Sequence, residues 1–177
     1  MKSNDYPAFY EKITAGIRRS ENGVRGLNIV NRLLTLFMYM LYPLMIAALL
    51  LTGFLDGGLR EAVHRALPYI LIPGVSFVLL TVIRDRLDWK RPYEEHDIRP
   101  LIRKETRGHS MPSRHVFSCA IIAMCALSLN SPAGWLCLFF ALLLCVIRVL
   151  GGVHYPRDVM AGLVIGLLAG YLLFVFP

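Results

Sequence analysis

The chain has 177 residues, of which 56% are hydrophobic, and its mean hydropathy is +0.55. It is too apolar for an ordinary soluble domain and too short for several domains. The net charge is +7, but the basic residues flank long apolar runs. This pattern favours lipid headgroups and phosphate substrates as partners, in a bilayer, and argues against nucleic acid.

The first 30 residues are polar but patterned. Phe9, Ile13 and Ile17 recur at helical spacing among basic residues, which predicts a short amphipathic helix lying in the membrane interface. A loosely ordered tail fits the same residues equally well. We therefore assign residues 1–30 to an N-terminal interfacial segment and residues 31–177 to a membrane-embedded domain.

Long charge-free runs follow along the rest of the chain. A helix that crosses a bilayer needs roughly 20 apolar residues. A turn at Asn130-Ser131-Pro132 divides the longest run, because a proline after two turn formers ends a helix. The fold class is therefore predicted to be all-α, a multi-span transmembrane helix bundle in the cell membrane. About five spans are expected, at 31–54, 66–83, 112–129, 133–150 and 157–176.

Small and sulfur-containing residues within the spans suggest packing roles. Four cysteines lie within the spans without the spacing of metal ligands, so we interpret them as packing residues. Glycines four residues apart in the last span allow two helices to approach closely. Packing within the bundle is favoured over dimerisation, which leaves a monomer or a homodimer. The residues are Cys119, Cys125, Cys137 and Cys145, and Gly162, Gly166 and Gly170.

The stretch from Arg84 to Met111 is the only long polar segment after the N-terminus, and its mixed charges are typical of a solvated loop. Arg84 and Arg91 are seven residues apart within it. If the helix of the second span continues past the membrane, two turns place both guanidinium groups on one face. Guanidinium groups match phosphate oxygens well, although solvated or lipid-anchoring arginines would show the same spacing.

The segment Pro112-Ser113-Arg114-His115 stands where the third span begins. Pro112 suits the first position of a helix, and the free N–H groups of a first turn attract anions. Ser113 and Arg114 add hydrogen-bond donors, and His115 can supply a proton to a departing oxygen. An ordinary helix cap with an interfacial histidine is the competing interpretation.

The third cluster of candidate site residues consists of Arg148, His154 and Asp158. His154 and Asp158 can meet across one helical turn, and Pro156 between them suits a first turn. A carboxylate on one imidazole nitrogen fixes the tautomer and leaves the other nitrogen as a nucleophile or base. Taken singly, a surface histidine beside a capping aspartate and an arginine at a helix end are ordinary features.

Together the three clusters supply a nucleophile, an orienting acid, a leaving-group acid and several guanidinium groups, all near span ends. Phosphoryl transfer needs mainly positioning and stabilisation of negative charge. The arginines would do what Mg²⁺ does in other enzymes. Because no carboxylate or His/Cys set has the pattern of a metal site, the sequence predicts a metal-independent reaction with no cofactor.

These motifs resemble the type-2 phosphatidic acid phosphatase superfamily, the lipid phosphate phosphatases. The family pattern is a basic residue, six residues and Arg-Pro; then Pro-Ser-Gly-His; then Ser-Arg, five residues, His, three residues and Asp. The order and the spacing agree across roughly residues 66–176. The matching segments are Arg84-x6-Arg91-Pro92, Pro112-Ser113-Arg114-His115 and Ile147-Arg148-x5-His154-x3-Asp158.

The resemblance implies a role for each matched residue. His154 would attack phosphorus and form a phosphohistidine that water then hydrolyses, Asp158 would orient it, and His115 would protonate the leaving group. The remaining matched residues would hold the phosphoryl oxygens: Arg84, Arg91, Ser113, Arg114 and Arg148.

Three departures from the pattern bear on substrate choice. Arg84 replaces the usual lysine, Arg114 the usual glycine and Ile147 the usual serine, and none of these changes removes a catalytic group. The expected substrates are undecaprenyl pyrophosphate, phosphatidylglycerol phosphate or phosphatidic acid. The family generally has six spans, whereas five are counted here.

Two observations point to opposite orientations in the membrane. The positive-inside rule assigns the arginine-rich side to the cytoplasm, whereas resemblance to bacterial lipid phosphatases implies an active site on the outer face. Since several of the counted arginines belong to the site, we expect the extracytoplasmic face. Two other classes stay open: a non-catalytic lipid-binding or transport protein, and a relative of the vanadate-dependent haloperoxidases, which share this type of anion site.

Overall fold

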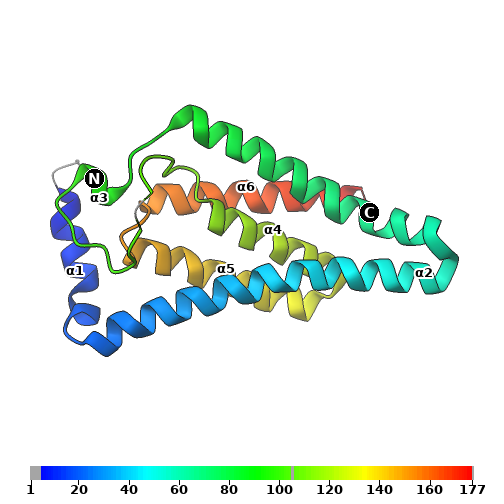
Figure 1. The fold of residues 1–177 in the computed structure, drawn as a ribbon, viewed down its shortest axis with the longest axis horizontal. Coiled ribbons are helices and arrows are strands. Elements are labelled where there is room, and N and C mark those ends of the chain that lie inside the picture. Colours follow the sequence, from blue (N-terminus) through cyan, green and yellow to red (C-terminus); the bar gives the residue numbers. More distant parts are fainter. Residues whose placement is uncertain (1–4, 105, 177) are drawn as a thin grey trace.

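The computed structural model describes residues 5–104 and 106–176. Within them the chain is helical, and the long helices run side by side (Figure 1). The elements are α1 (Tyr6–Arg18), α2 (Glu21–Leu87), α3 (Pro92–Glu95), α4 (Arg114–Leu129), α5 (Ser131–Leu150) and α6 (Pro156–Val175).

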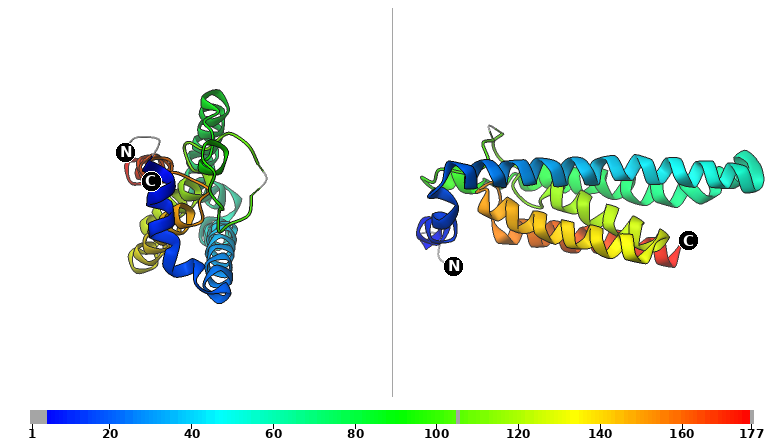
Figure 2. Two further views of the ribbon diagram at one scale, coloured as in Figure 1. Left: turned by 90° about the vertical axis from the view of Figure 1, so that its left-hand side faces the viewer. Right: turned by 90° about the horizontal axis from the view of Figure 1, so that it is seen from below.

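Helix α2 is a hairpin of two limbs that meet at Gly57 and Gly58 (Figure 1). Gly58 has φ +72°, a conformation that side chains rarely adopt, so glycine suits this turn. The two limbs are linked by a hydrogen bond of 2.7 Å, which the Tyr42 hydroxyl donates to the Tyr69 carbonyl oxygen. The hairpin extends past the far ends of the other helices (Figure 2).

Helix α4 occupies the centre of the bundle. Its residues from Val116 to Ala126 are almost all buried. Met38 of the first α2 limb packs in a cluster with α4 and α5, and Leu80 of the second limb packs on Phe117 of α4. Because α4 contacts both limbs as well as α5 and α6, it fixes the position of whatever its N-terminus carries.

The glycine stripe of α6 lies against α4, which confirms the prediction that it serves packing within the bundle. A Cβ at Gly162 would lie 2.6 Å from the carbonyl oxygen of Ser113, and one at Gly170 would lie 2.3 Å from the Cβ of Met124. Both distances are shorter than any ordinary contact, so the two helices are as close as their backbones allow. The four cysteines are buried free thiols, also as predicted.

Helix α1 lies across one end of the bundle, roughly perpendicular to the long helices (Figures 1 and 2). Its most buried face consists of Tyr6, Tyr10 and Thr14 rather than the predicted apolar stripe, whose residues are only partly buried. The Tyr10 hydroxyl donates to the Leu150 carbonyl at 3.1 Å and accepts from the Leu101 N–H at 3.3 Å. Helix α1 thus ties the end of α5 to the loop before α4.

The all-α membrane fold is confirmed, and the five predicted spans correspond to the two limbs of α2 and to α4, α5 and α6. Among the described residues, three segments are long and apolar enough to cross a membrane, Glu21–Glu95, Ser131–Leu150 and Pro156–Val175; α4 is a shorter apolar helix. The first limb begins at Glu21, not near residue 31, so the predicted interfacial segment also holds the first turns of α2; residues 1–4 lie outside the described residues.

Candidate active site

Three segments distant in sequence meet at the end of the bundle that α1 crosses. They are the end of α2 with α3, the N-terminus of α4, and the turn between α5 and α6 (Figure 1). A cavity of about 180 Å³ opens among them and the loop that connects α3 to α4. It is lined by Arg84, Asp85, Arg91, Lys104, Thr106, Arg107, His109, Arg114, His115 and His154.

The histidine–aspartate pair lies at the base of this cavity. His154 is 1% exposed, and its Nδ1 lies 3.7 Å from Oδ2 of the fully buried Asp158. The same Oδ2 accepts hydrogen bonds from the Tyr155 N–H at 3.1 Å and from the Ser110 hydroxyl, which fix the carboxylate. Burial lowers the pKa of His154 to about 4 although Asp158 opposes the shift. A neutral ring whose Nδ1 faces the carboxylate leaves Nε2 for the cavity.

The N-terminus of α4 differs in detail from the prediction. Pro112 is not the first helical residue: Ser113 is the N-cap and the helix begins at Arg114. The Ser113 N–H donates to the Asp158 carbonyl oxygen at 2.9 Å, which joins α4 directly to the first turn of α6. Pro156 does occupy the first turn of α6, as predicted, and the Ser113 hydroxyl is buried without a hydrogen-bond partner in the described residues.

Arg84 and Arg91 reach the cavity, but not for the predicted reason. Helix α2 ends at Leu87, and Arg91 is the N-cap of α3, so the two arginines do not share a helical face. They converge because both guanidinium groups donate to the carbonyl oxygen of His109, Arg91 at 3.4 Å. Arg91 also donates to the carbonyls of Gly108 at 3.0 Å and Val153 at 3.1 Å. Both arginines therefore hold the surrounding loops as well as lining the cavity.

Of the remaining predicted site residues, Arg114 and His115 line the same cavity and Arg148 does not. Arg114 is exposed, and His115 is half-buried with its ring stacked on Tyr39, centroid to centroid at 6.2 Å. Arg148 is 4% exposed, and no described acceptor bonds its Nε. Its guanidinium group is buried at the end of α5, just before the turn that carries His154. Buried polar atoms without hydrogen-bond partners are uncommon in folded proteins. Several such atoms lie at this site, on Ser113, Arg148, His154 and Asp158, which suits the binding of a polar ligand.

Sequence reasoning missed several residues of the site. Ser110, which orients Asp158, gave no signal beyond standing three residues before Ser113. Lys104 and Arg107 lie in a mixed-charge loop that was interpreted as mostly solvated, and no periodicity distinguishes a residue that turns inward from its neighbours. Tyr39 belongs to a span whose aromatic residues all looked alike.

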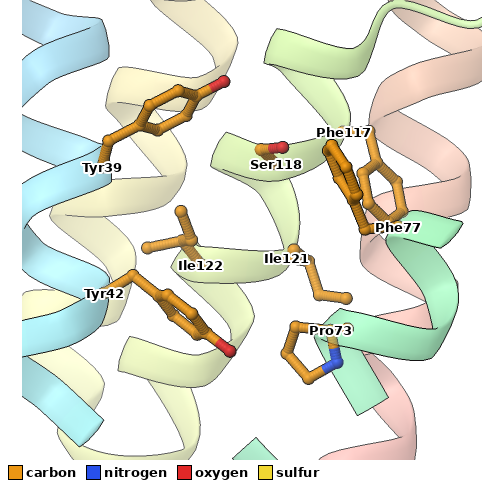
Figure 3. A pocket seen from close by; sticks show the side chains of 9 residues that line it. Tyr39, Tyr42, Pro73, Phe77, Phe117, Ser118, Ile121 and Ile122 are labelled. Atoms are coloured by element: carbon orange, nitrogen blue, oxygen red, sulfur yellow. The ribbon is translucent and has the colours of Figure 1, made fainter. Parts of the chain in front are cut away.

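A second, apolar pocket adjoins the site. It measures about 410 Å³ and lies between the two limbs of α2 and one face of α4, as Figure 3 shows. Tyr39 belongs to this pocket and stacks on His115, so the pocket starts within one helical turn of the charged cavity. The other lining residues are Tyr42, Pro73, Gly74, Phe77, Phe117, Ser118, Ile121 and Ile122.

The architecture is that of a multi-helix membrane protein. It has a positively charged site, suited to binding an anion, that is built around a buried histidine–aspartate pair. In the part of the chain that the structure describes, no three His, Cys, Asp or Glu side chains are grouped closely enough to hold a metal ion.

Comparison with known proteins identifies the family. The model of the PAP2 superfamily matches residues 41–177, and the chain belongs to this superfamily. It is 30% identical over 131 residues to the undecaprenyl-diphosphatase BcrC of Bacillus subtilis (strain 168), covering 73% of this chain and 66% of that protein. It is 38% identical over 68 residues to a bacitracin transport permease protein BcrC of Bacillus licheniformis, covering 38% and 32%. The chain thus spans just under two thirds of the length of the first relative and about a third of the length of the second.

Two solved structures share the fold. Aquifex aeolicus LpxE superposes with a TM-score of 0.58 at 23% identity, covering 86% of this chain and 94% of that chain. A transmembrane PAP2-type phosphatidylglycerolphosphate phosphatase from Bacillus subtilis superposes with a TM-score of 0.55 at 21% identity, covering 99% and 95%. At sequence identities of 23% and 21%, this structural similarity is evidence for the fold alone.

Proposed function

We propose that the protein is an integral membrane phosphatase that hydrolyses a lipid phosphate or pyrophosphate, without a metal, through a phosphohistidine on His154. One observation carries the proposal. A neutral, buried His154 paired with Asp158 lies in the same cavity as His115 and the guanidinium groups of Arg84, Arg91 and Arg114. These are the groups that a two-step phosphoryl transfer requires.

The steps follow from the positions of the side chains. Nε2 of His154 attacks phosphorus, and the bond to the leaving oxygen breaks, with His115 as the source of its proton. Asp158 stabilises the charge that develops on the imidazole ring. The arginines and the Ser113 hydroxyl stabilise the negative charge on the phosphoryl oxygens. Water then attacks the phosphohistidine, releases phosphate and restores the free ring.

The apolar pocket supports a lipid as the substrate. Its side chains are aromatic and aliphatic, it lies between helices that face the bilayer, and it adjoins His115 through Tyr39. A phosphorylated headgroup in the charged cavity would thus place its apolar tail beside α4, in contact with the membrane. The candidates are undecaprenyl pyrophosphate, which the name of the Bacillus subtilis relative suggests, phosphatidylglycerol phosphate and phosphatidic acid.

The decisive assay is phosphate release from these three lipids by purified protein in detergent with EDTA present. The wild type should be active, and His154→Ala should lose at least about 10³-fold in kcat, because a covalent nucleophile has no substitute. His64→Ala is the matched control, since His64 is exposed on the α2 hairpin. Full activity of His154→Ala would overturn the mechanism.

We further propose that the active site faces the extracytoplasmic side. The buried native cysteines make a labelling test clean, because an impermeant maleimide should not reach them. Arg103→Cys places a thiol on the exposed loop beside the site, and Arg60→Cys places one at the opposite end of the bundle. In intact cells the first should be labelled and the second protected, and the reverse pattern would place the site in the cytoplasm.

Two alternative functions give different results in the same preparation. A lipid-binding or transport protein would release no phosphate from any lipid, and His154→Ala would leave its function intact. A haloperoxidase relative would begin to oxidise halide when vanadate is added, whereas vanadate should inhibit a phosphatase. The apolar pocket beside the anion site favours the phosphatase.

A further inference from the structure

More positive charge lines the cavity than the matched motifs account for. Arg84, Arg91 and Arg114 belong to those motifs, but Lys104 and Arg107 come from the loop between α3 and α4. Asp85 is the one carboxylate among the described lining residues. A single phosphoryl group carries a charge of about −2 at neutral pH, so the cavity has cationic capacity beyond one such group.

Lys104 is placed among the catalytic groups rather than on the outer surface. Its side chain is half-buried, and it lines the same cavity as His154 and as His115, the proposed proton donor. Burial, followed by repulsion from Arg91 and three other guanidinium groups, lowers the pKa of Lys104 to about 7. An anion bound among these groups would relieve that repulsion and keep the ammonium group charged.

The cavity that Lys104 shares with the two histidines indicates which part of the substrate it contacts. His154 would bond the phosphorus that is transferred, and His115 serves the oxygen that departs. Three arginines of the matched motifs already line the cavity for the transferred phosphoryl group, so the additional charge of Lys104 is available on the leaving-group side. In a lipid monophosphate that side holds an alcohol oxygen, whereas in a lipid diphosphate it holds a second phosphate group.

We propose that Lys104, assisted by Arg107, forms a second phosphate subsite that binds the inner phosphate of a lipid diphosphate and makes such lipids the preferred substrates. The inference rests on the proposed phosphatase function. His154 attacks the terminal phosphorus, the bond from that phosphorus to the bridging oxygen breaks, and its electron pair leaves on the lipid monophosphate. Lys104 neutralises the negative charge that the inner phosphate carries and gains in this step.

The test compares two substrates that differ only in the second phosphate, farnesyl diphosphate and farnesyl monophosphate, with the full chain in detergent. Lys104→Met keeps the length of the side chain and removes its charge. It should lower kcat/KM for the diphosphate by about 10- to 100-fold, the effect of losing one charge-assisted contact, and by less than about 3-fold for the monophosphate.

Two further variants control the comparison. Arg103→Met removes a positive charge from the neighbouring, exposed position outside the cavity and should leave the substrate ratio unchanged. Lys104→Arg retains the charge and should retain most of the preference for the diphosphate. Equal losses on both substrates, or no loss on either, would overturn the subsite.

A binding measurement separates this inference from the proposed function. In the His154→Ala background, farnesyl diphosphate should bind at least about 10-fold more tightly than the monophosphate, and adding Lys104→Met should abolish that difference. If the wild type releases phosphate but the His154→Ala protein binds both substrates alike, the subsite alone is overturned. A wild type that releases no phosphate from any lipid would overturn the proposed function, whatever the binding shows.

Discussion

Replacing Gly162 by alanine tests whether the contact between α4 and α6 positions the catalytic groups. The added Cβ would lie 2.6 Å from the Ser113 carbonyl oxygen, whereas ordinary contacts begin near 3.4 Å. The helices must therefore separate by about 0.8 Å at a point one turn after Asp158, whose carbonyl accepts from the Ser113 N–H. A displacement of about 1 Å at a catalytic site can cost on the order of 10²-fold in rate. We expect Gly162→Ala to lower kcat/KM by about 10- to 100-fold.

Two other glycine variants separate geometry from stability. Gly170→Ala crowds Met124 in the same helix pair but far from the site, and overpacking of this kind costs about 1–3 kcal/mol of unfolding free energy. Its kcat/KM should stay within about 3-fold of the wild type. Gly26→Ala meets nothing within 4 Å and should be neutral or slightly stabilising. Phosphate release and thermal unfolding, measured in one detergent, test all three; equal activity losses at positions 162 and 170 would refute the reasoning.

Three further predictions follow from the site. Because burial lowers the pKa of His154 to about 4, its nucleophilic neutral form persists as the pH falls. The value of kcat/KM, corrected for ionisation of the substrate, should therefore decline only below about pH 5. A decline centred near pH 6.5 would contradict this prediction. Arg91→Lys should lower the unfolding temperature and reduce kcat at least about 10-fold, since an ammonium group cannot span the carbonyls of Gly108, His109 and Val153; an unchanged melting curve would argue against the loop-holding role. EDTA should leave the rate of phosphate release unchanged, and a loss that Mg²⁺ restores would disprove metal independence.

The sequence predicts the membrane helices well where apolar runs are continuous. Helices α5 and α6 lie within two residues of the expected spans at both ends. The length of α2 was underestimated because a helix does not end where the membrane does. It starts at the polar Glu21 and continues through the charged residues Arg84, Asp85 and Arg86 to Leu87. Hydropathy measures burial in lipid, not the persistence of backbone hydrogen bonds.

Five of the eight residues that the motifs predict line one cavity, but the motif spacing does not give the reasons for their positions. The helical argument for Arg84 and Arg91 failed because Asp88 takes a left-handed conformation and ends α2 between them. Lys104 was missed because a long loop without periodicity does not reveal which residues turn inward. Contacts between segments distant in sequence decide both cases, and local patterns do not encode them.

The covalent role of His154 is the central claim, and isolating the intermediate tests it most directly. Wild-type protein would be mixed with a lipid diphosphate labelled on its terminal phosphate, quenched in alkali, which preserves phosphohistidine, and mapped by mass spectrometry. Phosphate should appear on Nε2 of His154 and be absent from the His154→Ala protein. Label on another residue, or an active wild type that carries none at any time point, would contradict the account.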